Sequence, residues 1–455
     1  MNKPINKKLP PEVRSVFKKF QKANQEIYLV GGAVRDWLLK KDKIEDLDFT
    51  TIAPPEKIQE IYPRSFYNNQ FGTVRIPQKD KKEPLEITTY RSEEDYGDFR
   101  HPQKVQRGKS IEEDLKRRDF TINAIALGLS EENKLFLVDP HQGQKDLQKR
   151  LVRCVGKPQE RFQEDALRLI RAIRFAAKLD FSIEEKTLQA IKQNALLIKK
   201  VSAERVRDEL LKILVRPHVD MALQLMRETK IIDCILPELT QGYEMKQKGH
   251  HLWDVWKHSV MAVKFCPSLD PIVRLATLLH DIGKPTVMKE KNGERTFYNH
   301  EVVGAAMARK MGQRLRLSKK DVLRLANLVR WHQFSVSEEQ TDSAIKRFIR
   351  HVGLENVPDM LDLRVGDRLG SGAKLTSWRT EEFKKRLIEV QKEPFAIKDL
   401  KINGRDVMRI LNIEPGPKVG EILTEIFEKV DRKELPNERE KLLAEVTKEI
   451  AKPSS

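Results

Sequence analysis

The chain has 455 residues and a net charge of +18, which favours polyanionic partners such as nucleic acid, although basic surfaces also serve solubility. Its length suits about three domains without disulfides or a structural metal, and the isolated Cys154, Cys234 and Cys266 are typical of a reduced cytoplasmic protein. No apolar run reaches the roughly 18 residues of a membrane span or follows the first lysines, so we expect neither a membrane segment nor a secretory signal.

Strand and helix signals alternate up to about residue 155, with short β-like runs such as EIYLV, DLDFT and LEITTY. From Gly156 onward apolar residues recur at three- and four-residue spacings, as in amphipathic helices. We therefore expect an α+β fold in which a small mixed-sheet head (residues 1–155) precedes a long all-helical body.

An acidic pair and a glycine pair stand out in the head. Gly31 and Gly32 end the run EIYLV and open a helix, whose free N–H groups could cradle a phosphate. Asp46 and Asp48 alternate with apolar residues, so on a strand their carboxylates share one face, roughly 7 Å apart. Two such carboxylates suit the paired Mg²⁺ ions of phosphoryl transfer. A tight turn and a solvated strand edge are the alternatives, but the combination favours nucleotidyl transfer.

The motifs GGAVRD and DLDF resemble those of the class II tRNA nucleotidyltransferase/poly(A) polymerase family. LKRRDFTINAIAL, DPHQGQKDL, ERFQEDALRLIRAIRFAAKL and SAERVRDELLKIL follow in the family's order, over about the first 215 residues. This resemblance implies that Asp46 and Asp48 bind catalytic Mg²⁺ and that Gly31, Gly32 and Arg35 contact the nucleotide. Glu86 in LEITTY is our candidate for a third catalytic carboxylate on a neighbouring strand.

Nucleotide selection is expected downstream. The resemblance implies that Arg118 and Asp119 contact the ribose and triphosphate, and that Asp165 and Arg168 read the base. At i, i+3 on a helix the last two would share a face. Together they could pair with the amino donor and ring acceptor of cytosine or adenine and reject uracil and guanine. An ordinary intrahelical salt bridge is the alternative.

Further basic residues are expected to contact nucleotide or RNA. Arg171 and Arg174 belong to the predicted nucleotide-binding set, and with Arg205 and Arg207 they would hold the tRNA backbone. Residues 90–110 are polar and without clear periodicity, which indicates a functional or disordered loop. In the resembled family a flexible loop here is needed for terminal A addition.

A second site is indicated by the order H…HD…H…H…D, which resembles the HD phosphohydrolase superfamily. Imidazoles and carboxylates suit a divalent transition metal that activates water. Asp362 competes with Asp367 as the last ligand, and a degenerate structural module is the alternative. The predicted ligands are His258, His280, Asp281, His300, His332 and Asp367.

These motifs divide the body into a neck (residues 156–240), an HD domain (241–375) and a tail (376–455) that contacts tRNA. Gly416 and Gly420 in the tail could offer N–H groups to an RNA phosphate or form a plain packing corner.

The resemblance predicts addition of CCA to the 3′ end of tRNA from CTP and ATP, in the cytoplasm and without a stable protein partner. Poly(A) polymerase and A-adding or CC-adding enzymes are alternatives with the same chemistry. A phosphohydrolase with a non-catalytic RNA-binding head is the alternative from another class.

Overall fold

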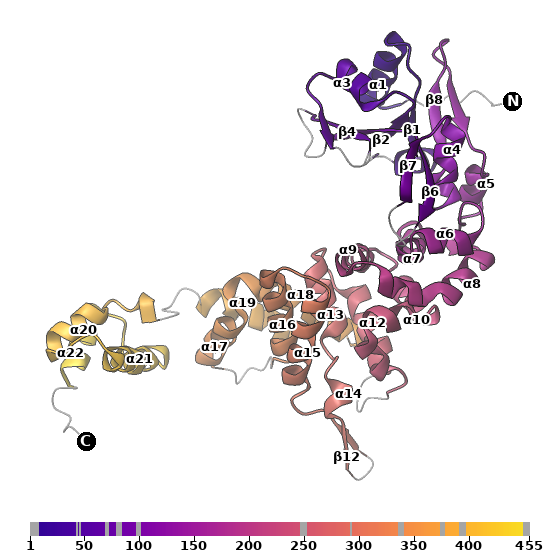
Figure 1. The fold of residues 1–455 in the computed structure, drawn as a ribbon. Helices are drawn as coiled ribbons and strands as arrows, with labels where there is room; N and C mark the ends of the chain where they lie inside the picture. The colour runs from indigo at the N-terminus through magenta and orange to yellow at the C-terminus, as the bar shows by residue number, and fades with distance from the viewer. Residues whose placement is uncertain are drawn as a thin grey trace.

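The computed structural model describes residues 9–41, 44, 47–68, 72–78, 84–96, 102–245, 253–291, 294–334, 341–373, 378–390 and 397–448. The head and the C-terminal tail lie at opposite ends of an elongated molecule, with the helical neck and body between them (Figure 1). No helix among these residues is both long and apolar enough to cross a membrane.

One seven-stranded sheet forms the head, in the order β3-β4-β5-β2-β1-β8-β9. β2 and β5 run parallel and the other neighbours antiparallel, which confirms the predicted mixed sheet. On one face, Phe17 of helix α1 (Pro11–Lys22) packs edge-on against Phe49 of β2. The strands are β1 (Ile27–Val30), β2 (Asp48–Thr51), β3 (Phe66–Asn68), β4 (Thr73–Ile76), β5 (Leu85–Thr89), β8 (Ala126–Leu129) and β9 (Leu135–Val138).

Two more strands follow β5 within the segment that we expected to lack regular structure. β6 (Arg91–Tyr96) and β7 (Pro102–Arg107) pair antiparallel, so that expectation is wrong for these residues. Hydrogen bonds between backbone N–H and C=O groups form such a hairpin whatever its side chains are. A hairpin of polar residues can therefore form without the alternation of apolar and polar residues by which strands are predicted. The chain then enters α4 (Ile111–Lys116), whose apolar side chains cover the other face of the sheet near Val30.

Helices dominate the rest of the chain. Two short ladders accompany them, β10 (Leu151–Val152) with β11 (Ser182–Ile183), and β12 (Lys289–Lys291) with β13 (Glu294–Thr296). The neck helices are α6 (Pro158–Glu164), α7 (Leu167–Leu179), α8 (Glu185–Asn194), α9 (Ala203–Leu214), α10 (Val219–Glu228) and α11 (Ile231–Ile235). The body helices are α12 (Val255–Phe265), α13 (Pro271–Leu279), α14 (Lys284–Val287), α15 (His300–Arg314), α16 (Lys319–Trp331), α17 (Asp342–Val352), α18 (Val357–Gly370) and α19 (Trp378–Glu389).

Neck and body share a core. Buried Arg274 on α13 bonds the carbonyls of Leu214 on α9 and Val263 on α12, at 3.0 and 3.2 Å from Nη1. One set of buried apolar side chains runs from Leu9 to Val390. The predicted domain boundaries at residues 155 and 240 therefore stay predictions, because the segments on either side of them share this core.

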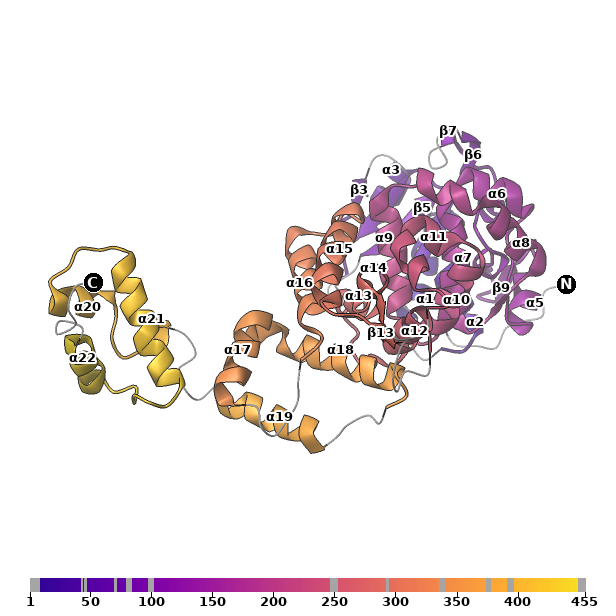
Figure 2. The ribbon, with the colours of Figure 1, turned by 90° about the horizontal axis from the view of Figure 1, so that it is seen from below.

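The tail has its own small core of apolar residues from Leu400 to Val446. It is built from α20 (Gly404–Leu411), α21 (Pro417–Asp431) and α22 (Arg439–Lys448). Seen from below, the end of α21 approaches α17 and α19 of the body (Figure 2).

Candidate functional site

The glycine turn, a carboxylate and a guanidinium converge at one end of the central strands β1 and β2. Gly31 has a φ of +69°, a conformation that favours glycine, and it begins α2 (Gly32–Leu38). A Cβ added there would lie 3.2 Å from Arg118 Nη1 and 3.8 Å from Asp48 Oδ2. Asp48 is exposed at the start of β2, whereas Asp46 lies outside the described residues. The predicted phosphate cradle and one predicted metal ligand are thus adjacent.

Glu86 lies directly opposite Asp48, because β2 and β5 pair in parallel with these two residues in register. Residues in register on neighbouring strands present their side chains on the same face. Glu86 Oε1 also accepts from Arg75 Nε at 2.8 Å. Glu86, the third predicted carboxylate, therefore lies beside Asp48 and forms an ion pair with Arg75.

Arg35 and Asp119 are buried and already bonded. Arg35 lies beneath the glycine turn and donates to Asn123 Oδ1 at 2.7 Å and Asp36 Oδ1 at 2.9 Å, so its burial does not support direct nucleotide contact. Asp119 Oδ2 accepts from Arg171 Nε at 2.9 Å. Burial raises the pKa of Asp119, but the Arg171 guanidinium outweighs this and lowers it to about 2. Asp119 thus stays ionised and anchors the neck to the head.

The predicted helical pair of Asp165 and Arg168 is wrong in its geometry. Asp165 is extended (φ −142°, ψ 102°) between α6 and α7, and its Oδ1 accepts from the N–H of Leu167 at 3.1 Å. The carboxylate thus caps the start of α7 instead of lying on a helix face. Its Oδ2 pairs with Arg205 Nη2 at 2.9 Å.

Arg168 faces other partners at this junction. Its guanidinium donates to Glu164 Oε2 at 2.7 Å and to the Arg117 carbonyl at 3.0 Å. The carboxylate and the guanidinium are consequently positioned independently of each other. Both nevertheless lie at the break between α6 and α7, where Arg168 contacts the Arg117 carbonyl of the head.

Arg171 and Arg174 do not form a free basic face, contrary to our expectation. Arg174 is 8 % exposed and pairs with the carboxylate of Glu209 on α9, while Arg171 pairs with Asp119. Sequence reasoning missed Glu209 and gave Arg205 only a role in RNA contact. Their only signal was the motif SAERVRDELLKIL itself, since a partner 35 to 40 residues away leaves no local pattern.

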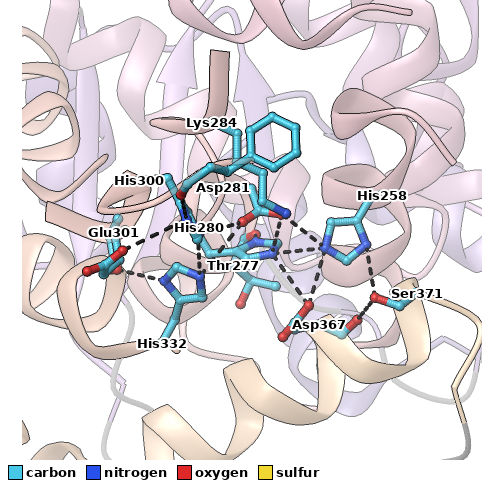
Figure 3. Close-up of polar contacts among 12 residues, drawn as sticks. His258, Thr277, His280, Asp281, Lys284, His300, Glu301, His332, Asp367 and Ser371 are labelled. Carbon is cyan, nitrogen blue, oxygen red and sulfur yellow. Dashed lines mark hydrogen bonds and ion pairs between the residues drawn. The ribbon is translucent and has the colours of Figure 1, made fainter. Parts of the chain in front are cut away.

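The body brings all six predicted HD residues into one buried cluster (Figure 3). Five of them are at most 2 % exposed. Asp362 is absent from this cluster, and Asp367 fills the place for which the two competed. The six residues of the cluster come from α12 (His258), the end of α13 (His280, Asp281), the start of α15 (His300), the end of α16 (His332) and α18 (Asp367).

Backbone carbonyls fix the tautomers of three of these histidines. The Nδ1 atoms of His280, His300 and His332 lie 2.7 to 2.8 Å from the carbonyls of the residues three positions earlier. A carbonyl only accepts, so each Nδ1 carries hydrogen, and in its neutral form each ring turns a bare Nε2 inward. The Nε2 atoms of His300 and His332 are 3.3 Å apart. Two lone pairs at that distance repel each other unless a proton or a metal ion lies between or beside them.

Asp281 divides the cluster into two groups. Its Oδ2 lies 3.3 and 3.4 Å from Nε2 of His280 and His258, whereas its Oδ1 lies 3.3 and 3.8 Å from Nε2 of His300 and His332. Asp367 Oδ1 completes the first group at 3.2 Å from His258 Nε2. Each group offers imidazole and carboxylate donors that suit a divalent transition metal.

The electrostatics of the cluster also favour bound cations. Burial lowers the pKa of His280, but the carboxylates of Asp281 and Asp367 raise it to about 10. Burial and the neighbouring His280 lower the pKa of His332 to about 3. The two carboxylates therefore favour positive charge at the centre.

Glycines allow the helices to approach closely enough to form this cluster. A Cβ on Gly366 of α18 would lie 2.5 Å from the Ala262 carbonyl of α12, and one on Gly283 would lie 2.1 Å from the His300 carbonyl.

Sequence reasoning missed two cationic side chains that contact the carboxylates of the cluster. Lys284 Nζ is 2.6 Å from Asp281 Oδ2, and Arg364 Nη1 is 3.3 Å from Asp367 Oδ2.

A mixed-sheet head with adjacent carboxylates and a glycine turn, joined to a helical neck with charged residues at the junction, defines a nucleotidyltransferase. Models of three families match the chain: the poly A polymerase head domain (residues 27–153), the probable RNA and SrmB-binding site of polymerase A (180–242) and the putative tRNA nucleotidyltransferase domain 2 (305–446). The chain belongs to the tRNA nucleotidyltransferase/poly(A) polymerase family and is a tRNA nucleotidyltransferase, as its motifs predicted.

Individual relatives cover nearly the whole chain. A CCA-adding enzyme of Lactococcus lactis subsp. lactis is 33% identical over 97% of this chain and 98% of its own length. An A-adding tRNA nucleotidyltransferase of Deinococcus radiodurans is 33% identical over 88% and 90%. The crystal structure of the Bacillus stearothermophilus CCA-adding enzyme in complex with CTP superimposes with a TM-score of 0.74 at 28% identity, covering 97% and 98%. Nucleotidyltransferases of this kind use a divalent metal.

Proposed function

We propose that this enzyme adds CCA to the 3′ end of tRNA, with CTP and ATP as substrates. The observation that carries the proposal is the head–neck junction, where the Asp165 carboxylate and the Arg168 guanidinium are each held by a separate partner. Cytosine and adenine both present an amino donor beside a ring-nitrogen acceptor, whereas uracil and guanine present the reverse. A fixed acceptor and a fixed donor would therefore select C and A and leave the wrong bases unpaired.

The chemistry is an in-line displacement in the head. The 3′-hydroxyl of the RNA loses its proton and attacks the α-phosphorus. The bond between the α-phosphorus and the oxygen that bridges to the β-phosphate then breaks, and pyrophosphate leaves. Asp46, Asp48 and Glu86 would hold Mg²⁺, which when bound stabilises charge on the attacking and leaving oxygens. Arg118, beside Gly31 and Asp48, would offset the charge of the triphosphate.

Addition of the terminal A alone is a second candidate, because the Deinococcus radiodurans relative is similar over most of this chain. The same junction would then read adenine only. Poly(A) polymerase activity is the remaining alternative with this chemistry.

One incubation separates these candidates. Transcripts of tRNA that end before CCA, after C and after CC are each offered CTP, ATP, UTP and GTP, singly and together. Growth by three residues that requires both CTP and ATP supports CCA addition. Extension of only the CC-ending transcript, by ATP, would replace the proposal with A addition, and unlimited A addition would replace it with poly(A) synthesis.

A metal-dependent phosphohydrolase activity of the body is our second proposed function. It is supported by the two donor groups that share Asp281, since His258, His280 and Asp367 would hold one ion and His300 and His332 the other. Ions bound there would polarise a phosphate ester and activate a water molecule. Hydrolysis of p-nitrophenyl phosphate and its bis-ester after loading with Mn²⁺, Co²⁺, Ni²⁺ or Zn²⁺ tests this. The variant H280A/D281A should lose hydrolysis and keep nucleotide addition; equal hydrolysis by the variant refutes it.

Because the proposed substrate is tRNA, the cytoplasm remains the expected location. The contacts described above require no stable protein partner.

A further inference from the structure

A buried carboxylate of the head contacts two arginines on the same helical turn. Asp114 lies on α4, is 0 % exposed, and precedes Arg117 and Arg118 by three and four residues. Side chains at these spacings are neighbours on a helix. The apolar residues of α4 belong to the buried cluster that contains Val30 of β1. Asp114 is therefore carried by a firmly packed helix beside the strand that ends in the glycine turn.

Each oxygen of the Asp114 carboxylate accepts from a different guanidinium group. Oδ1 lies 3.0 Å from Nε and 2.7 Å from Nη2 of Arg117. Oδ2 lies 3.3 Å from Nε and 3.0 Å from Nη2 of Arg118. A guanidinium is planar, so contacts with both nitrogens of one edge restrict the direction of the whole group. With Nε and Nη2 of Arg118 held in this way, its third nitrogen, Nη1, points away from Asp114.

The third nitrogen of Arg118 faces the glycine turn. A Cβ added to Gly31 would lie 3.2 Å from Arg118 Nη1 and 3.8 Å from Asp48 Oδ2. The Arg118 side chain is 20 % exposed, so a ligand in the turn can contact it, whereas the buried Asp114 is out of reach. Hydrogen bonds between a guanidinium and phosphate oxygens are among the strong ones. Arg118 thus connects a buried carboxylate to the proposed phosphate site.

The charges of these three residues favour an anion beside the turn. Burial raises the pKa of Asp114, but the guanidinium groups of Arg118 and Arg117 outweigh this and hold it below its ordinary value. One ionised carboxylate therefore faces two cations, and the three groups together carry one positive charge. The Arg117 carbonyl also accepts from Arg168 Nη2 at 3.0 Å, so the turn that follows α4 is tied to the neck as well.

We propose that Asp114 is a positioning residue for nucleotidyl transfer, because it directs Arg118 Nη1 toward the triphosphate of the nucleotide. Asp114 is buried, so it acts through Arg118 and does not contact the substrate. The inference rests on the phosphate-binding role proposed for Arg118, and it applies whether the enzyme adds CCA or the terminal A alone. A guanidinium that is already oriented loses less freedom when the nucleotide binds, which favours tight binding of the triphosphate.

The variant D114N tests this role, with D146N as the matched control. Asparagine has nearly the shape of aspartate, but its NH₂ group is a donor and cannot accept from a guanidinium. In D114N the KM for the nucleotide should therefore rise about tenfold, with the KM for tRNA unchanged. Asp146 is likewise 0 % exposed, but the arginine that pairs with it, at 2.6 Å, is Arg153. D146N should lose a comparable ion pair, measured as stability by calorimetry, and keep the nucleotide KM of the wild type.

A double-mutant cycle shows whether Asp114 acts through Arg118. D114N/R118Q should have the nucleotide KM of R118Q, since without the guanidinium of Arg118 there is nothing for Asp114 to direct. Additive effects of the two substitutions would overturn the inference. So would an unchanged nucleotide KM in D114N, or an equal rise in D146N, because a loosened head would then be a sufficient cause.

Pyrophosphate binding gives a second measurement that needs no RNA. Isothermal titration calorimetry with Mg²⁺ should show about tenfold weaker binding in D114N, and no weaker binding in D114N/R118Q than in R118Q. If the wild type extends no tRNA transcript, the proposed function fails, and the pyrophosphate affinities of these variants still decide the inference. Unchanged pyrophosphate affinity in D114N would overturn it.

Discussion

Arg205 Nη2 lies 2.9 Å from Asp165 Oδ2, and this ion pair ties α9 to the short segment between α6 and α7. Asp165 is outside any helix, so its carboxylate has no regular backbone to hold its direction. The pair is about three-quarters buried on both sides, and Arg205 holds one Asp165 oxygen while the Leu167 N–H holds the other.

Removal of Arg205 should weaken base selection more than it weakens nucleotide addition. In R205A the Asp165 carboxylate can turn away from the base edge, so the preference for CTP over UTP should fall roughly ten- to a hundredfold, equivalent to about 1–3 kcal/mol. Single-nucleotide kcat/KM values for the two substrates measure this ratio. R207A is the matched control, since Arg207 pairs with Asp208 and donates to the Arg316 carbonyl, partners other than Asp165. An unchanged ratio in R205A would show that Asp165 is held by other means.

Loss of the carboxylates at the start of β2 should abolish the chemistry without affecting the fold. Asp48 is exposed, so D48A and D46A/D48A should melt at the temperature of the wild type. Removal of metal-binding charge should lower the rate of nucleotide addition about a thousandfold, because several kcal/mol of stabilisation are lost. E60Q, which alters an exposed carboxylate on α3 (Pro55–Ile61), is the control. More than a tenth of the wild-type rate in D46A/D48A would refute the metal-binding role.

How far these sites could be predicted depends on how local their determinants are. The HD cluster was predictable because its six residues occur in a distinctive order along the sequence, and four of them end or begin a helix. The division of that cluster by the two oxygens of Asp281 was not, because it depends on how α13, α15 and α18 pack. The head sheet followed from alternating apolar residues, whereas the polar hairpin β6–β7 has no such pattern.

The helical pairing of Asp165 with Arg168 failed for a related reason. EDALR contains neither proline nor glycine, so nothing in it signals that the helix ends at Asp165. The break is stabilised by the carboxylate itself, which caps α7, and by Arg205, 40 residues further along the chain. Ion pairs between distant segments depend on the tertiary fold, and a local spacing rule cannot find them.

The HD cluster should bind two divalent ions per chain. After loading with Mn²⁺ or Co²⁺ and gel filtration, inductively coupled plasma mass spectrometry of the wild type should give about two ions from the two donor groups. H300A/H332A should retain one, and D281N should retain fewer than one because both groups lose a carboxylate oxygen. H218A, which removes a half-buried histidine outside the cluster, should retain both. A single ion in the wild type would contradict the two-group arrangement.

Acid should weaken the contact between head and neck through Asp119. Its pKa is about 2 in the folded protein and 3.8 in the unfolded chain, because the Arg171 guanidinium outweighs the effect of burial. A depressed pKa stabilises the fold above pH 3.8, and this contribution of about 2 kcal/mol is lost as the pH falls toward 2. Urea unfolding of the wild type and D119N should therefore differ by a constant amount above pH 5. The difference should shrink below pH 4, and a difference independent of pH would refute the assignment.

A methyl group on Gly283 should disrupt the second half of the HD cluster. The added Cβ would lie 2.1 Å from the His300 carbonyl and 2.7 Å from Gly304 N, both backbone atoms, so α15 must move. Such overpacking costs about 1–3 kcal/mol, and the shift of His300 should remove one bound ion. Gly420 is the matched control, because it lies in α21 with nothing within 4 Å of an added Cβ. G420A should keep both ions and gain up to about 1 kcal/mol of stability from helix propensity. Differential scanning calorimetry and metal analysis of the two variants test both expectations, and two retained ions in G283A would show that His300 does not depend on this close approach.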